Sequence, residues 1–84
     1  VYHLAIIQVE DRRQVGEALT AAGIGWGVHY PIPCHQQPAL ATFHPAQKLP
    51  VAEAAASRIL SVPMSPTLTV EQVARVCDVL GGAL

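Results

Sequence analysis

Hydrophobic residues follow two different periods in the first third of the chain. Tyr2–Val9 is apolar on both faces and contains β-branched and aromatic side chains, so we expect an inner strand that is covered on both sides. Asp11 and Gln14 predict a capping box at the start of a helix. The apolar stripe of this helix repeats at helical spacing up to Gly23 and consists of Val15, Ala18, Leu19 and Ala22.

The next segment alternates bulky residues with small ones. Between Ile24 and Tyr30, the large side chains are separated by Gly25, Gly27 and His29. This pattern predicts a strand with one bulky face and one nearly bare face. A bare face would let another backbone or a ligand approach closely.

Prolines divide the second half of the chain. Pro50 suits the first turn of a helix that continues to residue 60. Val62–Met64 lies among prolines, which cannot donate inside a sheet, so we expect a short edge strand there. Thr69 and Gln72 predict a second capping box. The helix that follows should end at Gly81, and its apolar stripe is Val73, Val76, Cys77 and Leu80.

The predicted order is strand, helix, strand, loop, helix, strand, helix. This order favours a small α+β domain with an antiparallel or mixed sheet and helices mainly on one face. The most informative segment is the loop within Gly27–Pro38, which carries three prolines, two histidines, a tyrosine and a cysteine. Because proline fixes φ and removes a backbone donor, this segment is neither a helix nor an inner strand. A stiff loop of this kind presents its side chains.

Composition and charge narrow the class of protein. A chain of 84 residues is one domain or one part of a larger one, and 51% hydrophobic with 13% charged residues indicates a face that packs on something else. A net charge of -1 with scattered basic residues gives no footprint for nucleic acid or anionic lipid. No apolar run approaches the ~20 residues that a membrane span needs. We therefore expect neither nucleic acid nor a membrane as a partner.

The two cysteines, Cys34 and Cys77, have neither the spacing of a disulfide framework nor that of a zinc site. We expect reduced thiols in a cytoplasmic protein and no bound metal. Cys34 beside His35 is poorly placed as a nucleophile with its base, because adjacent residues on an extended loop point opposite ways. The chain begins inside a strand pattern, so we also expect that an upstream portion is absent.

Several spaced blocks of sequence, taken together, resemble one family. The blocks are Gly23-Ile24-Gly25-x-Gly27-Val28, His29-Tyr30-Pro31-x-Pro33-x-His35-x-Gln37-Pro38, Leu49-Pro50-Val51-Ala52-Glu53, Ser61-Val62-Pro63-Met64-x-Pro66 and Leu68-Thr69-x-Glu71-Gln72-Val73. In this order they are similar to the C-terminal part of the DegT/DnrJ/EryC1/StrS family of pyridoxal-phosphate-dependent sugar aminotransferases. Leu40 and Trp26 depart from the family pattern. These departures leave the identity of the substrate open, but they do not affect the assignment to the family.

The resemblance implies that residues 1–84 are the C-terminal small domain of a fold type I enzyme. The cofactor-binding domain with its Schiff-base lysine is then missing, so we expect no catalytic residue here; Lys48 precedes a helix without an evident apolar pocket. The expected partners are pyridoxal phosphate, held mainly elsewhere, a nucleotide-linked keto sugar, and an amino-acid donor such as glutamate or glutamine. In full length we expect a homodimer.

Four side chains of the loop suit substrate binding as neutral hydrogen-bond donors and acceptors: His29, Tyr30, His35 and Gln37. By resemblance, His35 is the first choice for reaching the active site. Each has a structural alternative, since His29 can bond a backbone carbonyl, Tyr30 can be a core aromatic, and Gln37 can hold the turn. All four arginines lie on predicted helices, so the loop offers no bidentate clamp for a carboxylate.

Two other functions stay open at this point. The first is a related sugar dehydratase, in which another residue replaces the Schiff-base lysine. The second is a non-catalytic α+β binding module, which would fold and bind a small ligand without a cofactor.

Overall fold

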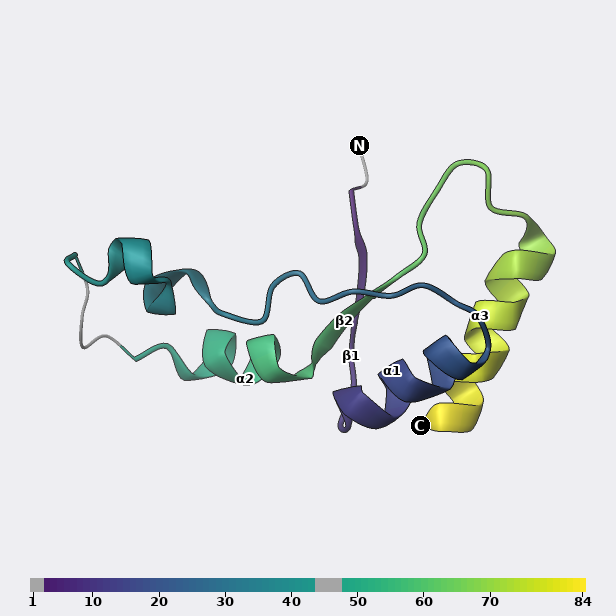
Figure 1. Ribbon diagram of the computed structural model, residues 1–84, viewed down its shortest axis with the longest axis horizontal. Helices are drawn as coiled ribbons and strands as arrows, with labels where there is room; N and C mark the ends of the chain where they lie inside the picture. Colours follow the sequence, from purple (N-terminus) through teal and green to yellow (C-terminus); the bar gives the residue numbers. More distant parts are fainter. Residues whose placement is uncertain (1–2, 44–47) are drawn as a thin grey trace.

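The computed structural model describes residues 3–43 and 48–84 (Figure 1). Its elements, in chain order, are β1 (Ala5–Gln8), α1 (Arg12–Ala21), the 3-10 turns η1 (Cys34–Gln36) and η2 (Pro38–Leu40), α2 (Pro50–Arg58), β2 (Ile59–Val62) and α3 (Val70–Ala83). The two strands are antiparallel, with Ile7 opposite Leu60. The predicted α+β class is confirmed, and the sheet is antiparallel rather than mixed.

One cluster of apolar side chains forms the core, between the sheet and two helices. Side chains alternate along a strand, and the inner face carries Ile7 on β1 and Leu60 on β2. These side chains pack against α1 and α3, and Leu19 and Leu60 are completely buried. Val15 is 2% exposed, so the predicted stripe of α1 is confirmed. Burying a leucine side chain of this kind contributes about 1.5–3 kcal/mol.

Polar contacts fix α3 against α1. The backbone N–H of Gln14 donates to the Asp11 carboxylate at 3.0 Å, which caps α1. The side-chain amide of Gln14 donates to the Ala83 carbonyl at 3.0 Å, at the far end of α3. The predicted reciprocal capping box at Asp11 is therefore only half formed, because Gln14 serves the other helix. Arg75 of α3 donates to the Ala22 carbonyl at 2.6 Å and closes the opposite end of the pair.

The last helix begins as predicted but ends later. Thr69 and Gln72 form both bonds of a capping box. Gly81 does not end the helix, which continues to Ala83, and Ala83 is buried in the core. Cys77 is exposed and Val73 is 48% exposed, so two members of the predicted stripe are wrong. The packed face instead uses Val76, Val79 and Leu80.

The strand predicted at Tyr2–Val9 is shorter and less covered than expected. Tyr2 lies outside the described residues, and β1 pairs with β2 alone among the described strands. Ile6, on the outer face, is 45% exposed. The prediction of an inner strand covered on both sides is therefore wrong for this chain. An apolar pattern shows that both faces of a strand can be buried, but it does not show whether other residues of the chain cover them.

The edge strand expected at Val62–Met64 begins three residues earlier in the structure, as β2. The helix α2 ends at Arg58 and β2 starts at Ile59, so Val62 is the last strand residue and not the first. β2 is also no edge strand, since Ser61 pairs with Gly27 on its other side through bonds of 3.1 and 2.7 Å. The strand predicted at residues 24–30 is reduced to this single bridge. Gly27 does let the backbone of another segment, at Ser61, approach closely, as expected.

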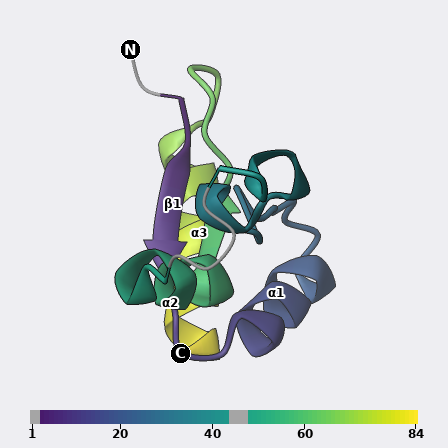
Figure 2. The same ribbon diagram turned by 90° about the vertical axis from the view of Figure 1, so that its left-hand side faces the viewer.

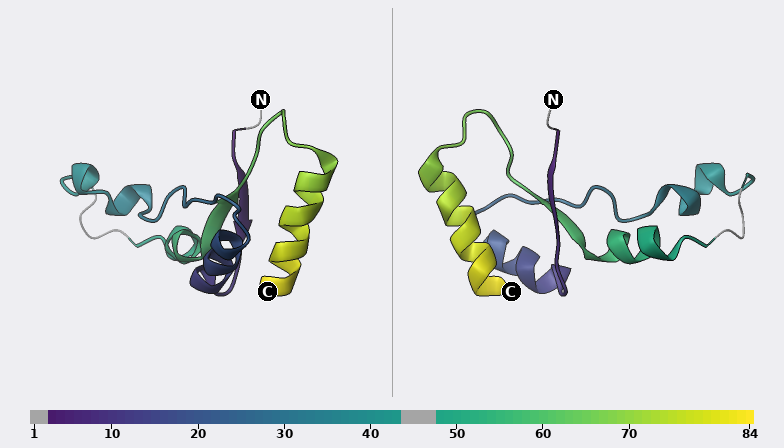
Figure 3. Two further views of the ribbon diagram at one scale, coloured as in Figure 1. Left: turned by 45° about the vertical axis from the view of Figure 1, so that its right-hand side comes forward. Right: turned by 180° about the vertical axis from the view of Figure 1, so that it is seen from behind.

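The remaining residues form an arm, which we define as residues 28–43 and 48–58. The other part, comprising β1, β2, α1 and α3, is called the body. Figure 1 and Figure 3 show the arm extending away from α1 and α3. The radius of gyration is 15.2 Å, whereas a compact domain of this length has about 12 Å. Ala56 is the one buried residue among the described residues of the arm.

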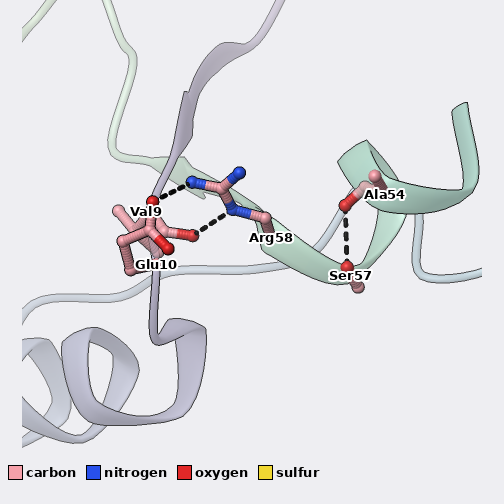
Figure 4. A network of polar contacts seen from close by, with 5 residues as sticks. All are labelled: Val9, Glu10, Ala54, Ser57 and Arg58. Atoms are coloured by element: carbon pink, nitrogen blue, oxygen red, sulfur yellow. Dashed lines mark hydrogen bonds and ion pairs between the residues drawn. The ribbon is translucent and has the colours of Figure 1, made fainter. Parts of the chain in front are cut away.

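Two arginines hold the base of the arm. Arg58 donates to the Val9 carbonyl at 3.1 Å and to the Glu10 carboxylate at 2.5 Å (Figure 4). From the body, Arg12 donates to the carbonyls of Ala56 at 2.6 Å and Ile59 at 3.2 Å. The two bonds from Arg12 satisfy one carbonyl in the last turn of α2 and one at its C-cap, where a helix leaves carbonyls without partners.

Candidate functional site

The outer face of the sheet holds the first candidate residue, His29. Strand alternation turns Ser61 away from the side that Leu60 faces, and yet Ser61 is only 5% exposed. The covering group is the imidazole of His29, whose Nδ1 lies 2.8 Å from the Ser61 hydroxyl oxygen. The ring lies directly over Gly27, because a Cβ added there would come within 3.2 Å of it. His29 is thus fixed in orientation by a hydroxyl and by the missing side chain of a glycine.

A shallow hollow of about 390 Å³ opens beside this histidine. It is lined by one end of the sheet, where β1 begins and β2 ends, and by the bridge segment, including His3, Gly25, His29, Ser61 and Met64. Imidazole and hydroxyl groups with bare backbone around them are hydrogen-bonding groups of the kind that orient a polar ligand.

Tyr30 follows His29 across a cis peptide bond and is 62% exposed. The two rings meet edge to face, with centroids 5.2 Å apart. The alternative interpretation of Tyr30 as a core aromatic is therefore wrong within this chain. Its phenol is available to a ligand or to another protein surface.

His35 is turned inward. Its side chain is 6% exposed, while the neighbouring Cys34 is exposed, so the two residues do point to different sides. The His35 Nε2 lies 3.4 Å from Oε2 of Glu53 on α2 and is buried without a hydrogen bond to the described residues. The loop thus does not present the His35 ring to solvent in this structure but lays it against α2.

Gln37 and Gln36 also make contacts within the arm. The Gln37 amide donates to the Ile32 carbonyl at 3.1 Å, which stabilises the turn. The Gln36 amide donates to Oε1 of Glu53 at 2.7 Å. In Figure 2, which looks along the arm, the loop and α2 accordingly lie side by side.

Glu53 is the residue that the sequence interpretation missed. Besides Gln36 and His35, it receives the backbone N–H of Leu49 at 2.7 Å. This backbone donor, together with His35 and Gln36, holds the pKa of Glu53 below its ordinary value of 4.5, against a smaller effect of burial. An acidic residue in the first turn after Pro50 was the available signal, but it indicates only a favourable helix start.

Trp26 packs on α1 rather than in the core. A Cβ at Gly16 would lie 2.3 Å from the indole carbon Cζ2, so only glycine admits the ring there. The indole N–H donates to the Thr20 hydroxyl at 3.0 Å, and Trp26 remains 38% exposed. Part of the indole ring therefore stays open to another surface.

The structure therefore separates the four predicted residues into two places. His29 and Tyr30 lie together where the arm leaves the sheet, beside the hollow. His35 and Gln37 lie farther out, in and just after η1, where their contacts are within the arm. Among residues 3–43 and 48–84 no three metal-binding side chains gather, and no helix is long and apolar enough to cross a membrane.

Comparison with known protein families identifies the class of this protein. Residues 1–81 match the DegT/DnrJ/EryC1/StrS aminotransferase family, and the chain is a member of that family.

Two of the similar relatives with curated descriptions are named as nucleotide-sugar aminotransferases. The chain is 48% identical over 81 residues to a UDP-N-acetyl-3-dehydro-alpha-D-glucosamine 3-aminotransferase of Acidithiobacillus ferrooxidans, covering 95% of this chain and 21% of the relative. It is 39% identical over 80 residues to the UDP-2-acetamido-2-deoxy-3-oxo-D-glucuronate aminotransferase of Pseudomonas aeruginosa, covering 95% of this chain and 22% of the relative. The chain thus spans about a fifth of the length of these relatives.

A solved structure has the same fold. DesV of S. venezuelae, in complex with a ketimine intermediate, superposes with a TM-score of 0.85 at 38% identity. The match covers 98% of this chain and 23% of DesV. The arm and the body together therefore correspond to one part of a larger enzyme fold.

Proposed function

We propose that the protein, in full length, transfers an amino group from an amino acid to a nucleotide-linked keto sugar. The observation that carries this proposal is the 48% identity over nearly the whole chain to an aminotransferase named for a UDP-linked 3-dehydro sugar. Two dTDP-sugar relatives are also named as transaminases for 3-amino sugars. The proposed substrate is therefore a nucleotide-linked 3-keto hexose, and glutamate or glutamine is the proposed donor.

Within that enzyme, we assign residues 1–84 to the C-terminal small domain. Family aminotransferases of this kind depend on pyridoxal phosphate, which supplies the electron sink for moving an amino group. The residues of this chain do not fit the whole coenzyme. Lys48 is exposed, whereas a lysine that forms an imine needs a desolvated or cationic site that lowers its pKa. The coenzyme is thus assigned to the rest of the protein, and this chain to substrate contacts.

We assign the substrate contacts to His29, Tyr30, His35 and Gln37. His29 and Tyr30 border the hollow and offer an imidazole and a phenol to sugar hydroxyls or phosphate oxygens. His35 and Gln37 shape the outer part of the arm, and we expect them to reach substrate once the arm is docked. The arm exposes Tyr30, Ile32, Phe43 and Val51. We propose that the rest of a homodimeric enzyme covers this surface.

The decisive experiment uses the full-length protein with pyridoxal phosphate. L-glutamate is supplied with UDP-N-acetyl-3-dehydroglucosamine or with a dTDP-linked 3-keto hexose, and mass spectrometry follows the sugar nucleotide. We expect the carbonyl oxygen to be replaced by an amine. A product that has lost a hydroxyl group instead would establish the dehydratase alternative. Binding without turnover on either sugar would favour the non-catalytic module.

Two variants test the residue assignments in the same assay. Tyr30→Phe should lower kcat/KM for the sugar about tenfold while leaving folding unchanged, because only the exposed hydroxyl is removed. His35→Ala should lower turnover more strongly, since both the ring and its place on α2 are lost. Unchanged kinetics would remove the corresponding residue from the proposed site.

A further inference from the structure

The carboxylate of Glu53 connects two segments that are far apart in the sequence. Its Oε2 accepts the backbone N–H of Leu49 at 2.7 Å, at the start of α2. Its Oε1 accepts the side-chain amide of Gln36 at 2.7 Å. The same Oε2 lies 3.4 Å from Nε2 of His35. A single side chain thus ties the η1 turn to the first turn of the helix that runs beside it.

This part of the arm has little else to hold it. Apart from the side chain of His35, which is 6% exposed, η1 and η2 bury no side chain, and α2 has only Ala56 in the buried class. Apolar burial is the usual source of a fixed loop position, and it is nearly absent here. Charge-assisted hydrogen bonds to a carboxylate are stronger than neutral ones, so Glu53 is the chief candidate for fixing the loop.

The unsatisfied nitrogen of His35 points to the same carboxylate. A buried ring nitrogen without a partner is costly, and Glu53 is the acceptor within reach. At 3.4 Å the two atoms lie just beyond ordinary hydrogen-bond distance, so a slightly shorter separation would commit one nitrogen of the ring to Glu53.

We propose that Glu53 is a positioning residue for the nucleotide sugar. It acts through Gln36 and His35, whose segment it holds on α2, and it does not touch the reacting atoms. This proposal rests on the proposed function for its substrate but not for its geometry.

The test uses Glu53→Gln in the full-length protein loaded with pyridoxal phosphate, because the amide keeps the size and removes the charge. The matched control is Glu71→Gln. Glu71 also lies in the first turn of a helix, is exposed, and makes no side-chain hydrogen bond within the described residues. Three quantities are measured: the Kd for UDP-N-acetylglucosamine, the single-turnover rate with the amino donor alone, and the hydrogen exchange of amides 34–37.

We expect Glu53→Gln to raise the Kd about tenfold, since small displacements of positioning groups have effects of at least this size. The rate with the donor alone should stay unchanged, and exchange at residues 34–37 should rise. Glu71→Gln should change none of the three. The double variant Glu53→Gln with Gln36→Glu exchanges amide and carboxylate, and it should recover part of the affinity.

Three outcomes decide the matter. An unchanged Kd with unchanged exchange overturns the proposal. Equal losses in sugar binding and in the donor reaction overturn it too, because they indicate a general structural defect. A wild-type protein that binds no UDP-N-acetylglucosamine and aminates no keto sugar overturns the proposed function, and in that case the exchange measurement still decides whether Glu53 holds the loop.

Discussion

The body and the arm of this chain are stabilised in different ways. The body buries Val15, Leu19 and Leu60 almost completely between the sheet and two helices. Among its described residues the arm has only Ala56 in the buried class, and it is held by hydrogen bonds that Arg12 and Arg58 donate and that Glu53 accepts. Apolar packing needs no particular partner atom, whereas each polar contact fixes one donor and one acceptor.

This difference explains where the candidate residues lie. A body with its own core is able to carry an arm that exposes apolar side chains, such as Phe43 at 71% and Val51 at 83%. Exposed apolar surface of this kind marks a binding surface. We infer that the arm acquires its final stability from another surface, and the following changes test the comparison.

The largest effect should come from the same substitution placed in each region. Leu60→Ala in the body should cost about 3–5 kcal/mol, because a fully buried side chain leaves a cavity. In the arm, Leu49 is 38% exposed, so Leu49→Ala should cost about 1 kcal/mol. Native-state hydrogen exchange at β1 and at α2 measures both. A loss at Leu49 as large as that at Leu60 would mean that the arm is fully covered in the assembled protein.

The base of the arm should be the next most sensitive place. Arg12→Ala removes bonds to the carbonyls of Ala56 and Ile59 and should cost about 1.5–3 kcal/mol, seen as faster exchange in α2. Arg13→Ala is the control, because its ion pair with Glu17 is exposed at both ends and should contribute about 0.5 kcal/mol or less. Similar effects of the two substitutions would contradict the assigned role of Arg12.

A smaller effect should follow from packing within the body. Gly16→Ala forces the Trp26 indole off α1, and we expect a net loss of about 1–2 kcal/mol because the gain in helix propensity offsets part of the strain. At Gly82 an added Cβ meets nothing within 4 Å, so Gly82→Ala should stabilise α3 by up to about 1 kcal/mol. Thermal unfolding of both variants gives the comparison, and stabilisation by Gly16→Ala would show that the ring moves without cost.

The smallest effect should be a response of the arm to acid. The pKa of Glu53 is lowered from 4.5 mainly by the Leu49 N–H, so its contribution is present above pH 4.5 and is lost as the pH falls through the lower pKa of the folded state. Below that pH range, the hydrogen exchange of amides 34–37 should therefore be the same in the wild-type protein and in Glu53→Gln. A difference that persists in strong acid would exclude the carboxylate as its cause.

The sequence by itself determined the elements whose signals are local. The apolar stripe of α1, the capping box of Thr69 and Gln72, and Pro50 in the first turn of α2 each depend on neighbours within four residues. The same holds for the proline-stiffened loop and for the blocks that carry the family resemblance. Such signals survive because short-range geometry is the same in any surroundings.

Tertiary structure decided the rest. Only the pairing of Ser61 with Gly27 makes β2 the middle segment, and only the contact with α2 turns His35 inward instead of outward. The side chain of Gln14 does not complete the capping box, because its amide donates to the carbonyl of Ala83 at the end of α3. Glu53 became the centre of a cluster for the same reason, since its partner Gln36 lies 17 residues away. Contacts across such separations depend on where the body directs each segment, and no periodicity along the chain encodes them.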